Sequence, residues 1–169
     1  YNEGRGAFDA SVNPLFKQLP NANEIGWYVL RGDARWDDST WWEVFGELHT
    51  GGIWLKKLSI IAQENGREPA ALKQADPEGK DGLTFPGKYD ISPKNGKPKN
   101  SEIGKYFFLP ALDYYRNGTL NYLGSYGYYW SSRTHSYNSS HAYYLYFYDR
   151  SVYLTYDDRS YGCVAQPFE

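Results

Sequence analysis

The segment YYLYFYDRSVYLT, residues 143–155, decides the fold. One residue in two is apolar in each half of this segment: Leu145 and Phe147, then Val152 and Leu154. A period of two is typical of a β-strand that buries one of its faces. The polar residues Asp149-Arg150-Ser151 lie between the two halves and indicate a turn. We therefore expect an antiparallel hairpin with one apolar face and one face rich in tyrosine.

Two more strands are expected in the C-terminal half of the chain. Tyr106–Pro110 is a short apolar run typical of a buried strand, and Cys163–Phe168 is expected to form the last strand. The N-terminal third carries helix signals instead. A short helix after Pro20 is expected to be capped by Asn21 or Asn23 and to end at Gly32.

Two further helices are predicted after Gly32. Thr40-Trp41-Trp42-Glu43 has the form of a capping box, in which a hydroxyl and a carboxylate each accept a backbone N–H. Apolar residues follow at helical spacing, up to the stop signal Gly51-Gly52: Trp41, Phe45 and Leu48. The third helix is expected over Ile53–Asn65, with Leu55, Leu58 and Ala62 on one face.

Helices grouped early and antiparallel strands grouped late predict an α+β fold. The 169 residues are expected to form one domain. Its middle, about residues 66–104, is rich in Pro, Lys and Gly, which indicates a surface insertion without long helices or central strands. The basic run Lys94–Lys99 in this insertion is typical of a solvated loop, so the sequence assigns it no partner.

Composition argues against several classes of protein and of site. The formal net charge is −2 and the pI is about 5.9, so we expect no general attraction to nucleic acid or to anionic membranes. No run of about 18 apolar residues is present, so we expect no membrane insertion. A single cysteine, Cys163, forms no disulfide framework, and no Cys/His cluster has zinc-ligand spacing. We expect no cofactor and no bound metal.

Tyrosine is concentrated near the C-terminus. Eleven of the eighteen tyrosines lie within residues 126–161, among Ser, Asn, Arg and Asp. Tyrosine pairs can stabilise an exposed sheet without any further role, but here tyrosines continue into predicted turns, where β-propensity is irrelevant. Rigid amphipathic rings interleaved with small polar groups are the composition of antibody paratopes. We therefore interpret this region as a binding surface.

The same region lacks particular amino acids. No Lys, Glu, Gln, Met or Trp occurs from Arg133 through Cys163. A codon of the form adenine-adenine-pyrimidine whose adenines are randomised can encode every amino acid except these. The absence therefore fits diversification by mutation at adenines, and a short segment rich in tyrosine and serine can also show it by chance.

Several motifs resemble a known family: Asn21-Ala22-Asn23-Glu24-Ile25-x-Trp27-Tyr28-Val29, Gly32-Asp33-x-Arg35-Trp36-Asp37, Tyr106-Phe107-Phe108-Leu109-Pro110-Ala111-Leu112, Gly124-Ser125-x-Gly127-Tyr128-Tyr129-Trp130-Ser131-Ser132 and Arg159-Ser160-Tyr161-Gly162. They resemble bacterial proteins of the Fibrobacter succinogenes major paralogous domain group. That group is similar to C-type-lectin-like domains, which include the variable proteins of diversity-generating retroelements. The resemblance covers about residues 20–65 and 105–169.

This resemblance implies a C-type-lectin-like display domain with a variable region at about residues 126–168. It implies a place on a cell or virion surface, within a larger surface, pilus or phage protein, and a protein or glycan as the ligand. Gly127–Ser132 and Arg159 correspond to constant scaffold. The positions that correspond to the variable, ligand-binding face are Tyr144, Tyr146, Tyr148, Ser151, Tyr153, Thr155, Tyr156, Asp157, Asp158 and Tyr161. Arg133, His135 and Tyr137 are expected to extend this face.

Alternatives remain open at this point. The chain lacks the Glu-Pro-Asn, Gln-Pro-Asp and Trp-Asn-Asp motifs of sugar-binding C-type lectins, so we expect no calcium-dependent sugar site of that type. An enzyme on the same fold, similar to formylglycine-generating enzymes, is one alternative. The chemistry of those enzymes resembles a two-cysteine site, and the single cysteine of this chain argues against it. His135, His141 and Cys163 could form a nucleophile with its base, but we interpret the two histidines as loop residues of the variable region and Cys163 as a small buried hydrophobic residue. The other alternative is a structural subunit whose tyrosine face packs against a neighbour.

Overall fold

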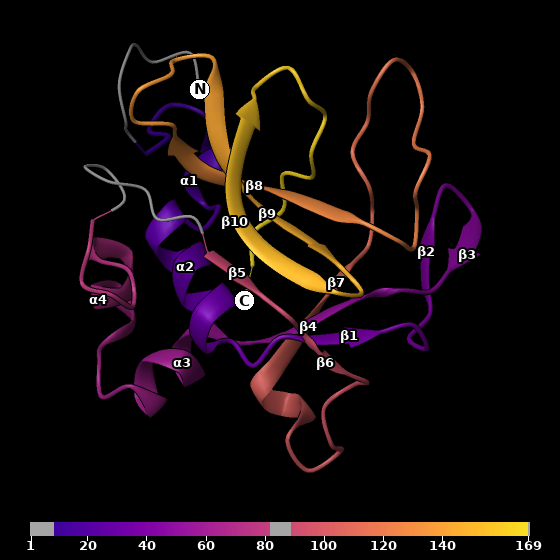
Figure 1. Ribbon diagram of the computed structural model, residues 1–169, viewed down its shortest axis with the longest axis horizontal. Coiled ribbons are helices and arrows are strands. Elements are labelled where there is room, and N and C mark those ends of the chain that lie inside the picture. The colour runs from indigo at the N-terminus through magenta and orange to yellow at the C-terminus, as the bar shows by residue number, and fades with distance from the viewer. Residues whose placement is uncertain (1–8, 82–88, 169) are drawn as a thin grey trace.

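Two four-stranded sheets, a separate hairpin and several short helices make up the part of the protein that the structure describes (Figure 1). This computed structural model describes residues 9–81 and 89–168. The helices are α1 Pro14–Lys17, α2 Ala22–Arg31, α3 Leu58–Glu64 and α4 Pro69–Gln74, with a 3₁₀ turn, η1, at Ile103–Lys105. The strands are β1 Arg35–Asp37, β2 Trp42–Val44, β3 Glu47–His49, β4 Gly52–Lys56, β5 Tyr89–Ile91, β6 Lys94–Asn95, β7 Tyr106–Pro110, β8 Gly127–Thr134, β9 His141–Tyr148 and β10 Ser151–Asp158. The α+β class predicted from the sequence is confirmed.

The predicted C-terminal hairpin is present. Strands β9 and β10 pair antiparallel from Tyr148 opposite Ser151 to His141 opposite Asp158, and Asp149-Arg150 form the turn. Strand β8 joins the other side of β9, and β5 joins β10, so the order across this sheet is β5-β10-β9-β8. All of these pairings are antiparallel.

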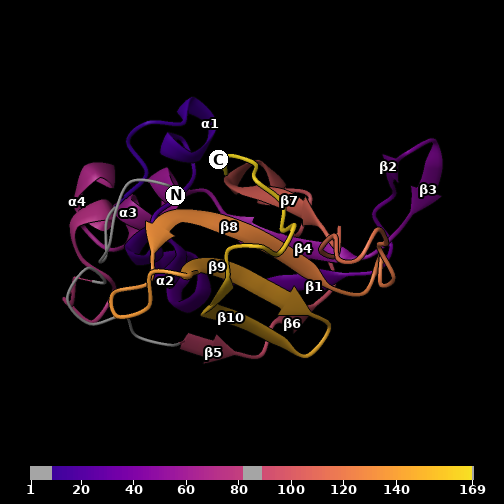
Figure 2. The same ribbon diagram turned by 90° about the horizontal axis from the view of Figure 1, so that it is seen from above.

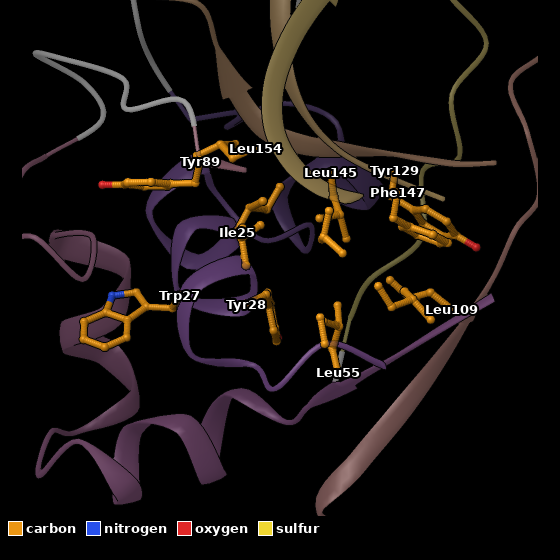
Figure 3. Close-up of a cluster of buried hydrophobic side chains, with 14 of the residues drawn as sticks. Ile25, Trp27, Tyr28, Leu55, Tyr89, Leu109, Tyr129, Leu145, Phe147 and Leu154 are labelled. Atoms are coloured by element: carbon orange, nitrogen blue, oxygen red, sulfur yellow. The ribbon is translucent and has the colours of Figure 1, made fainter. Parts of the chain in front are cut away.

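The apolar face of this hairpin lies in the core, as its alternation predicts. Leu145, Phe147 and Val152 are completely buried, and Leu154 is 3 % exposed. They meet side chains from α2, β4 and β7 in one cluster (Figure 3). Burying a side chain of this size contributes about 2 kcal/mol. A Cβ atom on Gly127 would lie 2.1 Å from Cζ of Phe147, so the ring of Phe147 fits against a glycine that cannot be enlarged without moving it.

Helix α2 covers the inner face of this sheet. Its N-terminus has the predicted cap: the Asn21 side chain accepts from the backbone N–H of Glu24, and Glu24 accepts from that of Asn21. Gly32 is the C-cap, as predicted. The capping box therefore begins a helix that buries Ile25, Tyr28 and Val29.

The second sheet has the order β6-β1-β4-β7. Strand β7 covers the predicted residues Tyr106–Pro110. The single helix expected over Ile53–Asn65 is wrong: its first residues form β4, and only Leu58–Glu64 are helical. Strand β4 pairs with β1 on one side and with β7 on the other, and these long-range hydrogen bonds outweigh the helical spacing of the sequence.

The helix expected from Thr40 onward is also wrong, because residues 42–49 form the hairpin β2–β3. The hydroxyl of Thr40 donates to Oδ2 of Asp37 instead of capping a helix. The turn consists of Phe45 and Gly46, with φ of 54° and 78°, which matches a two-residue turn that needs positive φ at both positions. Figure 2 shows this hairpin projecting from the body of the protein.

The middle segment contributes to both sheets and to the core. Strands β5 and β6 are edge strands, as expected for a segment rich in proline. Leu72 of α4 is completely buried, and the indole N–H of Trp27 donates to the backbone oxygen of Ala75. Within residues 9–81 and 89–168, no helix is long and apolar enough to cross a membrane.

The last strand expected at Cys163–Phe168 is absent from the structure. This segment touches the edge of β8 at one point, where Val164 accepts from the backbone N–H of Trp130 and donates to the backbone oxygen of Tyr128. Pro167 has no N–H to continue such a ladder. The segment nevertheless matters for the site, because it covers part of the outer face of the sheet.

Candidate ligand-binding surface

A row of stacked tyrosines crosses the outer face of the β8–β10 sheet. Tyr153 lies opposite Tyr146, and Tyr146 lies opposite Tyr128, so the three residues share one line across three strands. The ring centroids of Tyr146 and Tyr153 are 5.5 Å apart, and those of Tyr128 and Tyr146 are 4.7 Å apart, both stacked. All three rings are partly exposed. The sheet thus holds a rigid aromatic platform open to solvent.

More tyrosines extend this platform at both ends. Tyr126 contacts Tyr146 and Tyr148 with ring centroids 6.1 and 5.8 Å apart. The ring centroid of Tyr114 lies 4.7 Å from that of Tyr128 and 5.5 Å from that of Tyr161. We call the connected set the tyrosine platform: Tyr114, Tyr126, Tyr128, Tyr146, Tyr148, Tyr153 and Tyr161.

Sequence reasoning missed three members of the platform. Tyr128 lies within the motif interpreted as constant scaffold, although its place between the buried residues Gly127 and Tyr129 already puts it on the outer face. Tyr114 and Tyr126 lie just outside strands, where no periodic pattern identifies the direction of a side chain. Their membership follows only from the tertiary contacts.

The two central tyrosines of the platform, Tyr128 and Tyr146, are neutral and can both donate and accept hydrogen bonds. Burial raises the pKa of Tyr146 to about 12, although a hydrogen bond with Tyr128 acts in the opposite direction. Burial and the neighbouring Tyr146 also raise the pKa of Tyr128. Both hydroxyl groups therefore keep their protons at physiological pH. The guanidinium of Arg116 lies 5.1 Å from the ring centre of Tyr161, which places a cation at one border.

A half-open cavity of about 320 Å³ adjoins the platform where β9 turns into β10. Its lining is Trp36, Gly124, Ser125, Tyr126, Tyr148, Asp149 and Arg150. Its lining combines aromatic rings, which offer contact area, with the charged residues Asp149 and Arg150, which can fix the orientation of a ligand, as ligand sites commonly do. Tyr126 and Tyr148 belong to both features, so one ligand can contact the platform and the cavity together.

The structure brings most of the predicted site residues to this outer face. Partly exposed there are Tyr146, Tyr148, Ser151, Tyr153, Thr155, Asp157 and Tyr161. Tyr144 has the predicted direction but is only 7 % exposed, so the expectation that it is a surface residue is wrong. It packs against Trp130, and the partly buried Cys163 and Ala165 of the C-terminal segment cover the same cluster.

Tyr156 and Asp158 lie on the opposite face of the sheet from the platform. Tyr156 pairs with Tyr143, in the same alternation as buried Leu154, and packs against the main core. The ring centroids of Tyr156 and His135 are 3.9 Å apart. Grouping these two residues with Tyr153 and Thr155 is therefore wrong, because successive residues of a strand point to opposite faces.

His135 and Tyr137 lie in the loop between β8 and β9. The Nδ1 atom of His135 accepts from the backbone N–H groups of Tyr137 and Asn138, at 3.2 and 3.1 Å. The side chain of His135 is buried, so the expectation that it extends an exposed face is wrong. Tyr137 is 78 % exposed at the tip of this loop, apart from the platform contacts given above.

Arg133 is a structural residue in this arrangement. It is 2 % exposed, and its guanidinium contacts two carboxylates: Nε lies 2.7 Å from Asp9 and Nη1 lies 3.2 Å from Asp81. Asn23 donates to the same oxygen of Asp81. The expectation that Arg133 belongs to the exposed face is wrong, because this network draws its side chain into the protein. It connects β8 to the segments before α1 and after α4.

Ser140 and His141 form a contact that resembles a nucleophile and its base. Ser140 Oγ lies 2.9 Å from Nδ1 of His141. The single hydroxyl proton of Ser140 is donated to Oδ1 of Asn138 at 2.7 Å, so His141 must donate to Ser140 and is not placed to accept its proton. Burial raises the pKa of the Cys163 thiol, which opposes formation of a thiolate.

Within the part of the chain that the structure describes, no three His, Cys, Asp or Glu side chains gather as metal ligands. Comparison of the chain with family models, with curated proteins and with solved structures finds no match in any of the three. The functional interpretation therefore depends on the geometry of the platform and on the resemblance of the sequence motifs.

Proposed function

We propose that this chain is a non-enzymatic, ligand-binding display domain. In this proposal its fold is C-type-lectin-like, and the tyrosine platform binds a protein or glycan on another cell, as part of an adhesin or a phage receptor-binding protein. The observation that carries the proposal is the continuous stack of partly exposed tyrosines across β8, β9 and β10. Exposed aromatic patches of this kind mark interaction sites.

Two further observations support this function. The platform residues on β9 and β10 alternate with buried residues, so their side chains can be exchanged without altering the core. They also lie in the segment that lacks Lys, Glu, Gln, Met and Trp. A fixed scaffold with replaceable contact residues is the property that a diversified binding protein requires.

Replacing Tyr146, Tyr148 and Tyr153 together with alanine tests the assignment of the site. We expect the triple variant to lose at least about 30-fold in affinity, since truncating buried aromatic contacts costs at least about 2 kcal/mol at a hot spot. The ligand is first selected with wild-type protein on a glycan array and on a library of surface proteins. Its affinity for the variant is then measured by calorimetry.

Tyr115→Ala is the matched control, because Tyr115 is exposed and has no ring contact with the platform. We expect this variant to bind as wild type does. Circular dichroism must show that the triple variant is folded. Its melting temperature should fall only by the amount that the lost cross-strand tyrosine pairs explain. Equal affinity of the folded triple variant and wild type would place the site elsewhere.

Diversification predicts a second observation, in the DNA that flanks the gene. We expect a reverse transcriptase gene nearby and a near-copy of the codons for residues 126–168 that differs at adenines. The differing codons should include those for Tyr146, Tyr148 and Tyr153, and the codons for the core residues Leu145 and Phe147 should match. Sequencing of the locus checks this, and differences spread evenly over all base types would contradict retroelement mutagenesis.

A further inference from the structure

The hairpin β2–β3, together with the residue before it, carries three exposed large apolar side chains on one small element. Phe45 is 83 % exposed, Trp41 is 68 % exposed and Leu48 is 67 % exposed. The hairpin extends away from both sheets (Figures 1 and 2). Its remaining aromatic residue is used internally, because Trp42 stacks on His49 and donates to the backbone oxygen of Gly51. The side chains of Trp41, Phe45 and Leu48, by contrast, are mostly open to solvent.

Phe45 also occupies an unfavourable backbone position. Its φ of 54° lies in the left-handed region, which is an outlier for a bulky residue and which Asn or Gly would adopt at lower cost. The following residue, Gly46, has the conformation that such a turn favours. Nothing in the hairpin offsets the cost at Phe45, because its ring faces solvent. A strained residue with an exposed aromatic ring indicates that the ring itself has a use.

The charge around these residues limits what can cover them. Four acidic residues and no Lys or Arg occur between Arg35 and Lys56. Three of the four, Asp38, Glu43 and Glu47, are exposed on or beside the hairpin. An apolar centre with an acidic border fits a basic protein surface and is repelled by an anionic lipid surface.

The chain itself carries a surface of the opposite charge. The segment Lys94–Lys105 has four lysines and one acidic residue. Lys97 and Lys99 are exposed and form no ion pair with any other described residue. The half-buried residues Pro93 and Ile103 flank these lysines in the sequence, and lysine stems add apolar surface of their own. Figure 1 shows this loop at the bottom of the molecule and the hairpin at its right, so one molecule cannot join them.

We propose that the hairpin β2–β3 of one copy of this chain docks on the Lys97–Lys99 loop of a second copy. Phe45, Trp41 and Leu48 contact the loop, and the acidic residues of the hairpin face its lysines. The two surfaces are different, so the contact is head-to-tail and can be repeated along a row of copies. The tyrosine platform is not part of it and stays free in each copy.

Analytical ultracentrifugation of wild type and two variants tests this docking. Phe45→Asn removes the ring and places a residue that prefers the turn conformation, so its melting temperature should rise while association is lost. The second variant, K97E/K99E, keeps the hairpin and reverses the charge of the loop. Wild type should gain mass from about 5 to about 500 µM, the range expected of a small interface, and each variant alone should stay monomeric.

Mixing the two variants gives the decisive result. The hairpin of K97E/K99E can dock on the intact loop of the Phe45→Asn variant, and no further copy can be added, so a one-to-one dimer should form. Tyr137→Asn, which removes a ring of similar exposure from another loop, should associate as wild type does. A monomeric wild type, self-association of K97E/K99E alone, or the absence of a dimer in the mixture would each overturn the proposal.

Discussion

Arg133→Ala is expected to lower the free energy of unfolding by about 3 kcal/mol. The guanidinium is 2 % exposed and is held by Asp9 through two of its nitrogens and by Asp81 through a third. Removing it leaves two carboxylates, each about one-third exposed, without their cation, together with an unfilled space. Urea unfolding measures the loss.

Two other variants separate this role from a general effect of charge. Arg133→Lys should recover only part of the stability, because an ammonium group cannot contact both carboxylates in the geometry of the guanidinium fork. Arg150→Ala is the matched control: this arginine is 83 % exposed and lies 3.7 Å from Asp149, so its loss should cost less than about 0.5 kcal/mol. Equal stability of Arg133→Ala and Arg150→Ala would show that the buried network does not stabilise the fold.

Asp37→Asn is expected to cost about 2 to 3 kcal/mol at neutral pH, and this cost should disappear in acid. Burial alone would raise the pKa of Asp37, but hydrogen bonds from Ser39, Thr40 and Trp54 lower it to about 2. The four donors lie 2.6 to 2.9 Å from its oxygens. The asparagine amide would turn an N–H₂ group toward some of these donors, which leaves them unpaired.

The direction of the pH dependence follows from the lowered pKa. An aspartate with a pKa of about 2 in the folded state and an ordinary value near 3.8 in the unfolded state contributes its stability above about pH 4. That contribution is lost as the pH falls from about 4 to about 2. The difference between wild type and Asp37→Asn should therefore be constant from pH 7 to pH 4 and shrink toward pH 2. Urea unfolding at several pH values checks this, and a difference that persists unchanged at pH 2 would contradict it.

Elements that depend on local patterns were predictable. The alternation of Leu145, Phe147, Val152 and Leu154 identified β9, β10 and their buried face, because a strand places every second side chain on one side. Asn21 or Asn23 after Pro20 indicated the start of α2, because an N-cap depends on the residue next to the first turn. The two-residue period of a strand also placed Tyr146, Tyr148 and Tyr153 on the outer face before any contact was known.

Elements that depend on distant partners were not predictable. Thr40 and Glu43 have capping-box spacing, yet the buried carboxylate of Asp37 holds the Thr40 hydroxyl and the chain turns at Phe45-Gly46. Ile53–Lys56 can be read as the first turn of a helix, yet β1 and β7 pair with it on both sides. In each case a tertiary contact outweighed a weak local preference.

The sequence by itself determined the α+β class, the strands β9 and β10, and the direction of their tyrosines, because these follow from a period of two residues. The tertiary structure alone decided which of the predicted residues reach solvent together. It buried Arg133 between Asp9 and Asp81, covered Tyr144, turned Tyr156 to the opposite face, and joined Tyr114, Tyr126 and Tyr128 to the platform. The reason is that exposure depends on which distant segments cover a strand, and no local pattern carries that information.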